Sequence, residues 1–151
     1  MSEIQRIQDQ LRRAFEGEAW HGASLMELLE GVEAARAAAK PLPRAHSIWE
    51  IVLHIAACED EARRRIEGEA VDLSSEQAWP PVRNSGEAAW RETIAMLTRG
   101  QEALRRSMAK LDDAGLGARA AGKEYDMYFL LHGVIQHDLY HAGQIAVLKS
   151  G

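Results

Sequence analysis

Two histidines near the C-terminal end of the chain, His137 and His141, are spaced so that they can bind one metal ion together. They lie four residues apart in the segment HGVIQHDLYHAGQIAVLK, residues 132–149. On a helix this spacing places both imidazoles on one face, one turn apart. The same face carries four apolar residues: Leu130, Val134, Ile145 and Leu148. Both imidazoles are therefore expected to point into the core, where two ring nitrogens can bind one divalent metal ion.

A third histidine, His54, lies on another amphipathic segment, within the string LHIAACEDE. Three histidines from two helices would form a metal site with open coordination positions. The alternative is a set of packed core histidines that bond to backbone carbonyls. Each buried ring nitrogen left without a partner costs about 1–3 kcal/mol, and a shared metal satisfies one nitrogen of each ring. The pattern therefore favours metal binding by His54, His137 and His141.

The neighbours of the histidine pair supply the candidate catalytic residues, Asp138, Tyr140 and Gln144. The string HDLYH is similar to the H-E-x-x-H pattern of zinc proteases, with Asp138 at the position of the base. Only ten residues follow His141, so no distant downstream ligand completes such a site. Asp138 is then either a residue behind a ligating histidine or a surface acid. Gln144 can bond to a ligating imidazole or to another helix.

The remaining histidines and the single cysteine are weaker candidates. His132 lies on the side of the helix away from the pair, and we assign it to packing or to the surface. His46 is expected at the surface, and so is His21, which stands at a helix break. Cys58 follows His54 by one turn and is either a small core residue or a thiolate within reach of the metal. The sequence does not decide the roles of His21 and Cys58.

The elements that must position these residues are helical almost throughout. Apolar periodicity predicts helical segments over about 4–37, 48–67, 85–111 and 127–149. Gly17 and Gly22 can divide the first segment near Trp20. The pairs Ser24–Glu27 and Ser47–Glu50 form capping boxes, and Asp126 can cap the last helix. The fold class predicted for residues 1–151 is a single all-α domain, a four-helix bundle with a long crossover between its second and third helices.

The crossover, residues 68–83, has no clear periodicity and contains Pro80 and Pro81. A connection of this length between helices often carries function. We expect a pocket between the second and fourth helices, with walls from this crossover or from residues near Trp20. Core packing is the alternative for the tryptophans. The four are Trp20, Trp49, Trp79 and Trp90.

Composition and charge exclude several classes of function. The net charge of -5 argues against a nucleic-acid-binding protein, because the basic residues alternate with acids on helical faces. No apolar run approaches the roughly 20 residues of a membrane span, and the polar N-terminus is unlike a signal peptide. One cysteine, Cys58, allows no intrachain disulfide and fits a reducing compartment. We therefore expect a cytoplasmic protein that acts on a small molecule.

Three strings together identify the chain as similar to the DinB-like superfamily: WHGASLMELLEG, HSIWEIVLHIAACED and HDLYHAGQIAVLK. The resemblance spans nearly the whole chain. It implies a four-helix bundle, a divalent metal bound by His54, His137 and His141, and a homodimer. It also implies chemistry with low-molecular-weight thiols, because characterised relatives include thiol-dependent transferases and isomerases. Cys58 stands where relatives often have an aromatic residue, so the shape of the pocket can differ here.

These observations predict a metal-dependent enzyme. Three neutral imidazoles leave the metal its full charge, which favours activation of a thiol or of water. Transfer by an activated low-molecular-weight thiol and hydrolysis are the two reactions that follow, and the resemblance favours the first. The metal expected is Zn or Ni, with Fe or Mn as alternatives. The competing hypothesis is a dimeric module that binds a metal or a small ligand without turnover.

Overall fold

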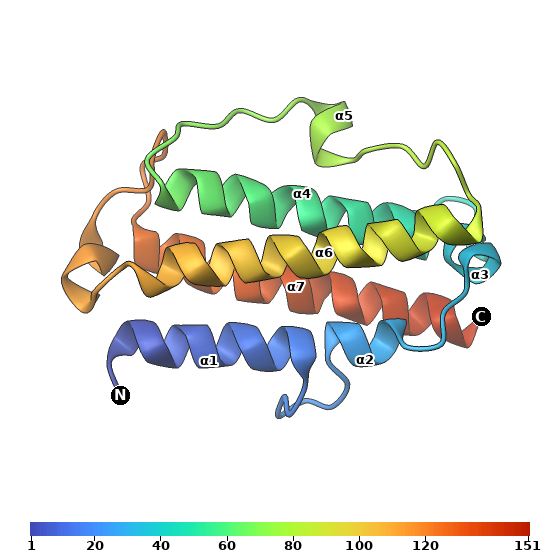
Figure 1. The fold of residues 1–151 in the computed structure, drawn as a ribbon, viewed down its shortest axis with the longest axis horizontal. Helices are drawn as coiled ribbons and strands as arrows, with labels where there is room; N and C mark the ends of the chain where they lie inside the picture. The colour runs from blue at the N-terminus through green and yellow to red at the C-terminus, as the bar shows by residue number, and fades with distance from the viewer.

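The computed structural model describes residues 1–151 and is all-α, as the periodicity predicts (Figure 1). Its elements are α1 (Glu3–Glu16), α2 (Leu25–Leu29), α3 (Ala34–Ala38), α4 (Ile48–Ile66), α5 (Ser75–Ala78), α6 (Glu87–Ala109), a 3-10 helix (Asp113–Gly117) and α7 (Met127–Ser150). The predicted boundaries of the last three long segments therefore hold within two residues. None of these helices combines the length and the apolar character that crossing a membrane requires.

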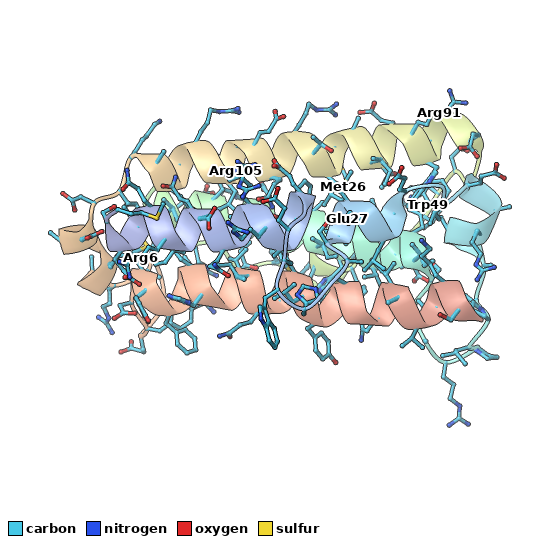
Figure 2. All side chains as sticks on the ribbon, turned by 90° about the horizontal axis from the view of Figure 1, so that it is seen from below. Arg6, Met26, Glu27, Trp49, Arg91 and Arg105 are labelled. Carbon is cyan, nitrogen blue, oxygen red and sulfur yellow. The ribbon has the colours of Figure 1, made fainter.

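The long helices pack side by side, with α4 in contact with both α6 and α7. The helices α1 and α2 lie end to end, and α1 contacts α6 and α7 (Figure 2). The chain runs in the same direction along α4 and α6, so the segment between them returns along the outside of the bundle and carries α5 (Figure 1). This arrangement puts the crossover beside α4, where His54 lies.

The first predicted segment is not one helix but three, α1, α2 and α3. Gly17 and Gly22 have φ angles of 149° and 127°, which side chains rarely adopt. A Cβ atom at Gly17 would also lie 2.9 Å from the Glu27 carboxylate. Ser24 then restarts the chain with a capping box, in which its hydroxyl accepts from the Glu27 backbone. The sequence contained both the break and the restart.

The helices that carry the histidines begin at the predicted caps. The Ser47 hydroxyl accepts from the Glu50 backbone N–H, and the Glu50 carboxylate accepts from the Ser47 N–H. The Asp126 carboxylate accepts from the Phe129 N–H at the start of α7. Caps of this kind contribute about 1 kcal/mol each and fix where a helix begins. They fix where α4 and α7 begin, and the apolar face that each helix buries then turns His54 and His141 inward.

The apolar core consists of two clusters, one toward each end of the bundle. Between the two clusters, each of the three long helices has a stretch without a buried apolar residue of either cluster. These stretches lie between Ile55 and Ala62 on α4, between Leu97 and Leu104 on α6, and between Ile135 and Ala142 on α7. One fully buried polar residue fills this stretch on each helix. We call this set the polar layer: Glu59 on α4, Gln101 on α6 and Asp138 on α7. The histidines lie beside it.

Candidate metal centre

The three histidines that the sequence singled out come together between α4 and α7. One ring nitrogen from each of His54, His137 and His141 lies within 4.8 Å of the other two. The Nε2 atoms of His54 and His137 are 3.1 Å apart. Two nitrogens that bind one metal at about 2.0–2.1 Å lie about 2.9–3.4 Å apart at octahedral or tetrahedral angles. The spacing of the His54 and His137 nitrogens therefore fits a shared metal ion.

The second ring nitrogen of two of these histidines is held by an oxygen acceptor. Nδ1 of His54 donates to the Ala78 carbonyl at 2.6 Å, and Nδ1 of His141 donates to Gln144 Oε1 at 2.7 Å. A neutral imidazole carries one N–H, so these bonds place the proton on Nδ1 and leave the Nε2 lone pair free. Metal-binding histidines are usually oriented in this way. The donor set therefore fits a divalent metal.

Burial favours the neutral form of the two inner histidines, which is the form that binds metals. His54 and His141 are both buried. Burial lowers the pKa of His54 and lowers the pKa of His141 to about 4. His137 is more exposed, and its Nδ1 lies 3.9 Å from the Asp138 carboxylate, which is too long for a hydrogen bond. It is the ligand candidate with the most freedom to move.

The polar layer lies against this group. Both carboxylate oxygens of Asp138, one of Glu59 and the amide oxygen of Gln101 are buried without a hydrogen-bond partner in the protein. Burial, followed by the proximity of Asp138, raises the pKa of Glu59 well above its usual range, and burial also raises the pKa of Asp138. Gln101 donates to the other Glu59 oxygen. Asp138 is therefore no surface acid, but a buried acceptor next to His137.

The crossover covers the site through Trp79. Its indole is stacked on His54, with ring centroids 3.7 Å apart, and on His46, with centroids 3.8 Å apart. Two imidazoles parallel to one indole at this distance cannot share a face, so Trp79 lies between them. The crossover therefore covers His54, but it contributes no residue to the cavity that His137 lines. His46 is exposed as expected, but it extends this stack.

Cys58 lies next to His54 without the features of a reactive thiol. Its Sγ atom is 3.7 Å from His54 Nε2. Burial and, to a smaller extent, the nearby carboxylates Glu61, Asp138 and Glu59 raise the pKa of the thiol to about 12. Reactive cysteines need the opposite environment, an electropositive one that favours the thiolate.

The other candidates lie at different places. Tyr140 is exposed, and its ring meets His141 edge-on with centroids 5.0 Å apart. His132 packs against the Tyr128 ring, with centroids 4.3 Å apart and planes inclined by 45°, and not against the three histidines. His21 is exposed on the connection between α1 and α2 and bonds the Ala23 carbonyl. Trp20 is fully exposed on the same connection and, with Ala19 and His21, lines a separate cavity, so the alternative expectation of a wall from residues near Trp20 is wrong. The break in the first segment carries Trp20 outward.

Glu59 and Gln101 are buried at the site, although the apolar pattern of the sequence did not identify them as site residues. Each occupies a core position of its helix, four residues after one apolar residue and three before the next: Ile55 and Ala62 around Glu59, Leu97 and Leu104 around Gln101. A polar residue within an apolar stripe was the available signal. The Ala78 carbonyl gave no signal, because a backbone acceptor has no sequence signature.

The fold and the site place the protein among the helical bundles that can hold a metal in the core between facing helices. Residues 19–145 match the family model of the DinB superfamily, and the chain belongs to this superfamily. Comparison with the curated proteins finds no match, and comparison with the solved structures finds none either.

Proposed function

We propose that this protein is a metal-dependent enzyme whose ion is held by His54, His137 and His141. The observation that carries the proposal is the pair of Nδ1 bonds, from His54 to Ala78 and from His141 to Gln144. These bonds leave the Nε2 lone pair of each ring free, and one nitrogen of each ring lies within 4.8 Å of a nitrogen of His137. Core histidines that only needed hydrogen bonds would not require this convergence of three rings.

The chain's own residues prepare the site in three ways. Gln144 and the Ala78 carbonyl fix the orientation of two imidazoles, which lowers the entropy cost of binding. Trp79 covers one side of His54 and excludes water there. Asp138 places a buried carboxyl group beside His137, and an ion bound there would favour its charged form. A divalent metal bound here would supply Lewis-acid activation of a thiol or of water.

Transfer to or from a low-molecular-weight thiol is the reaction that we favour, and hydrolysis is the second. Thiols bind Zn and Ni well, and three neutral ligands favour an anionic fourth ligand. Membership in the DinB superfamily supports this choice, since the resemblance implies thiol-dependent transferases. Cys58 does not act as the nucleophile in this proposal, because its environment disfavours the thiolate. The thiol is therefore a separate small molecule.

A specific observation favours a second function, a module that binds a metal or a small ligand without turnover. The acids near the site are occupied or enclosed. Glu59 and Asp138 are buried in the polar layer, and Glu61 is paired with Arg65 at 2.8 Å. None of the three is a free general base at the surface of the site, and the chemistry of a binding module needs no such base.

The decisive experiment begins with elemental analysis of protein purified without chelator. We expect about one equivalent of metal per chain. Addition of glutathione, cysteine or azide to the cobalt-substituted protein should then change its visible spectrum, and His54→Ala should remove both the metal and the response. Transfer of a thiol to a chromogenic electrophile by the loaded protein would support the enzyme. Stoichiometric metal with a spectral response but no turnover in transfer and ester-hydrolysis assays would support the binding module.

A further inference from the structure

We infer that the groove between the second half of α4 and the first half of α7 binds the apolar body of the substrate. The ligand class is a small organic molecule with an uncharged alkyl or aryl body and a metal-binding head, such as a thiol or carboxylate. This inference rests on the proposed function, because it assigns the substrate end that lies away from the metal.

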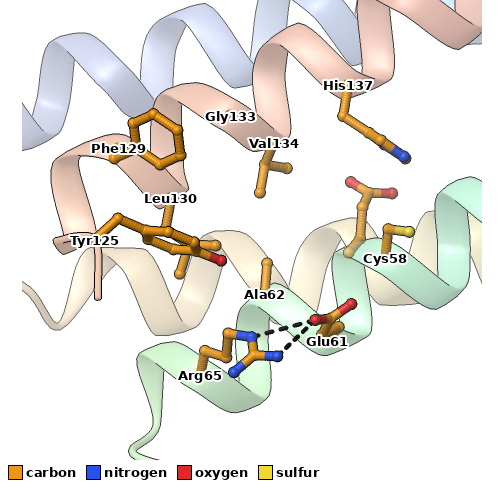
Figure 3. A pocket seen from close by; sticks show the side chains of 11 residues that line it. Cys58, Glu61, Ala62, Arg65, Tyr125, Phe129, Leu130, Gly133, Val134 and His137 are labelled. Carbon is orange, nitrogen blue, oxygen red and sulfur yellow. Dashed lines mark hydrogen bonds and ion pairs between the residues drawn. The ribbon is translucent and has the colours of Figure 1, made fainter. Parts of the chain in front are cut away.

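The groove begins at the metal centre. It is a cavity of about 220 Å³ that has His137 and Cys58 at one end and Tyr125 at the other (Figure 3). Among five cavities of the protein, it alone has one of the three histidines in its wall. From His137 back to Phe129 is eight residues of helix, or about 12 Å. A ligand in the groove can therefore reach both His137 and the aromatic end.

The larger neighbouring cavity approaches the same histidines from behind. It is lined by Gln144, Tyr140 and His46 but by none of the three histidines. Gln144 Oε1 accepts from His141 Nδ1, so the Gln144 side chain that lines this cavity is already bonded to that histidine. A ligand there would meet the support of His141 rather than a free coordination position. This contrast assigns the substrate body to the groove at His137.

The lining of the groove selects an apolar, uncharged body. Its walls between the two ends come mainly from Ala62, Val134, Leu130 and Phe129. The one charge pair in the wall is already neutralised, because Arg65 and Glu61 bond to each other at 2.8 Å (Figure 3). The guanidinium also donates to the carbonyls of Val71 and Ala121, so it is almost fully bonded. Apart from Glu59, whose buried carboxyl keeps one unpaired oxygen, this wall offers no unpaired charged partner to a ligand tail.

The volume limits the size of the body. Clefts that bind drug-sized ligands measure about 300–1,000 Å³, so a groove of about 220 Å³ fits a short alkyl chain or one ring. A peptide-like thiol such as glutathione is too large and too charged to be enclosed. The groove therefore receives the apolar partner of the reaction, and each methylene that it buries should tighten binding about fourfold.

Gly133 offers a direct way to fill the groove. It lies on α7 in the groove wall, and a Cβ atom there would meet no atom within 4 Å. Gly143 is the matched control, because it is on the same helix, has the same free space, and lines the cavity behind the histidines. Leucine is a better helix former than glycine, so Gly133→Leu and Gly143→Leu should both fold.

The test measures binding of acetate, butanoate and hexanoate to the cobalt-substituted protein by titration calorimetry and by its visible spectrum. The wild type should bind each longer acid more tightly, about fourfold per methylene until the groove is full. Gly133→Leu should bind all three acids as weakly as acetate, and Gly143→Leu should repeat the wild-type series. Equal affinities of all three acids for the wild type, or loss of the trend in Gly143→Leu alone, would overturn the groove assignment and leave the metal-site proposal intact.

The groove can also be tested if the metal-site proposal fails. If the protein holds no metal or acetate does not bind it, the proposed function fails. Hexanoate is then titrated into metal-free ¹⁵N-labelled protein, with the amide signals of Ala62, Gly133 and Val134 as the readout. Shifts confined to these residues, and absent in Gly133→Leu, would maintain the groove as a binding site. Unchanged spectra would reject it.

Discussion

The imidazole of His54 and the indole of Trp79 are stacked face to face, with centroids 3.7 Å apart and planes inclined by 2°. The two residues come from different parts of the bundle, because His54 is on α4 and Trp79 follows α5 in the crossover. Ala78, next to Trp79, accepts the hydrogen bond from His54 Nδ1. The crossover thus both covers and orients this candidate ligand.

This contact predicts that Trp79 reports metal binding through its fluorescence. Binding of Ni²⁺ or Co²⁺ at His54 should quench the indole that is stacked on it, because open-shell ions deactivate nearby excited states. Trp49 and Trp90 are enclosed in the core, and Trp20 is fully exposed on another connection. Trp79→Phe should remove most of the quenching while retaining a stacked ring. Trp20→Phe is the control, and equal quenching in Trp79→Phe and the wild type would contradict the prediction.

Removal of single histidines should separate the metal site from general stability. His137→Ala and His141→Ala each delete one of three converging nitrogens, and we expect neither variant to retain stoichiometric metal after dialysis. His132→Ala, on the same helix but away from the group, should bind metal as the wild type does. Plasma emission spectrometry measures the metal, and circular dichroism checks the fold. Similar metal loss in all three variants would show that α7 itself is disturbed.

Gln144 should affect metal affinity although it is not one of the converging ligands. Its amide oxygen holds Nδ1 of His141 at 2.7 Å, and loss of such support typically lowers metal affinity 10- to 100-fold. We expect Gln144→Ala to weaken Zn²⁺ binding by this factor in a chelator competition assay. Gln136→Ala, an exposed glutamine on the same helix, should have no effect. An unchanged affinity in Gln144→Ala would mean that His141 does not need this bond.

The polar layer predicts how stability depends on pH in the metal-free protein. Burial raises the pKa of Glu59 above the value of 4.5 expected for the unfolded chain. The unfolded state therefore releases this proton first as the pH rises. The stability contributed by protonated Glu59 is complete below pH 4.5 and is lost progressively as the pH rises through the folded-state pKa.

Glu59→Gln keeps the shape and removes the proton release. Its free energy of unfolding in urea, relative to that of the wild type, should therefore increase from pH 5 to pH 8 in the presence of chelator. Glu102→Gln, an exposed acid on α6, is the control and should show no such trend. A constant difference between Glu59→Gln and the wild type across this range would show that Glu59 is ionised in the folded protein.

Most of the fold was predictable because its signals are local. Apolar periodicity and the caps at Ser47 and Asp126 located α4 and α7 within two residues. The spacing of His137 and His141 predicted a shared face, which the structure has. The exit of Trp20 from the bundle was not predictable, because a glycine break shows where a helix ends but not the direction of the next residues.

The parts of the site that sequence reasoning missed depend on contacts between distant segments. The Ala78 carbonyl meets His54 only because the crossover returns along α4. Glu59, Gln101 and Asp138 meet because three helices are in register, and one helical pattern cannot set the register of another. Periodicity alone could have identified Glu59 and Gln101 as core positions, but it could not show that they form a layer beside the histidines.

We propose that the protein is a homodimer that pairs through the outer face of α7. Phe129, Tyr140 and Val147 are all more than 60% exposed, at 62%, 67% and 63%. Their spacings of 11 and 7 residues place them on one line of the helix, about 27 Å long. A stable interface buries about 1,200 Å² in total, or about 600 Å² on each copy, which a stripe of this length provides at a width of roughly 20 Å. A second copy of the same stripe is the partner whose apolar character matches it.

Light scattering at micromolar concentration should therefore give twice the 16.8 kDa mass of the chain. Tyr140→Glu and Val147→Glu place charges within the proposed interface and should convert the protein to a monomer. Met96→Glu is the control, because Met96 is an exposed apolar residue on α6, and this variant should remain dimeric. A wild type that scatters as a monomer would contradict the dimer. A dimer that survives both α7 substitutions but dissociates in Met96→Glu would place the interface on α6.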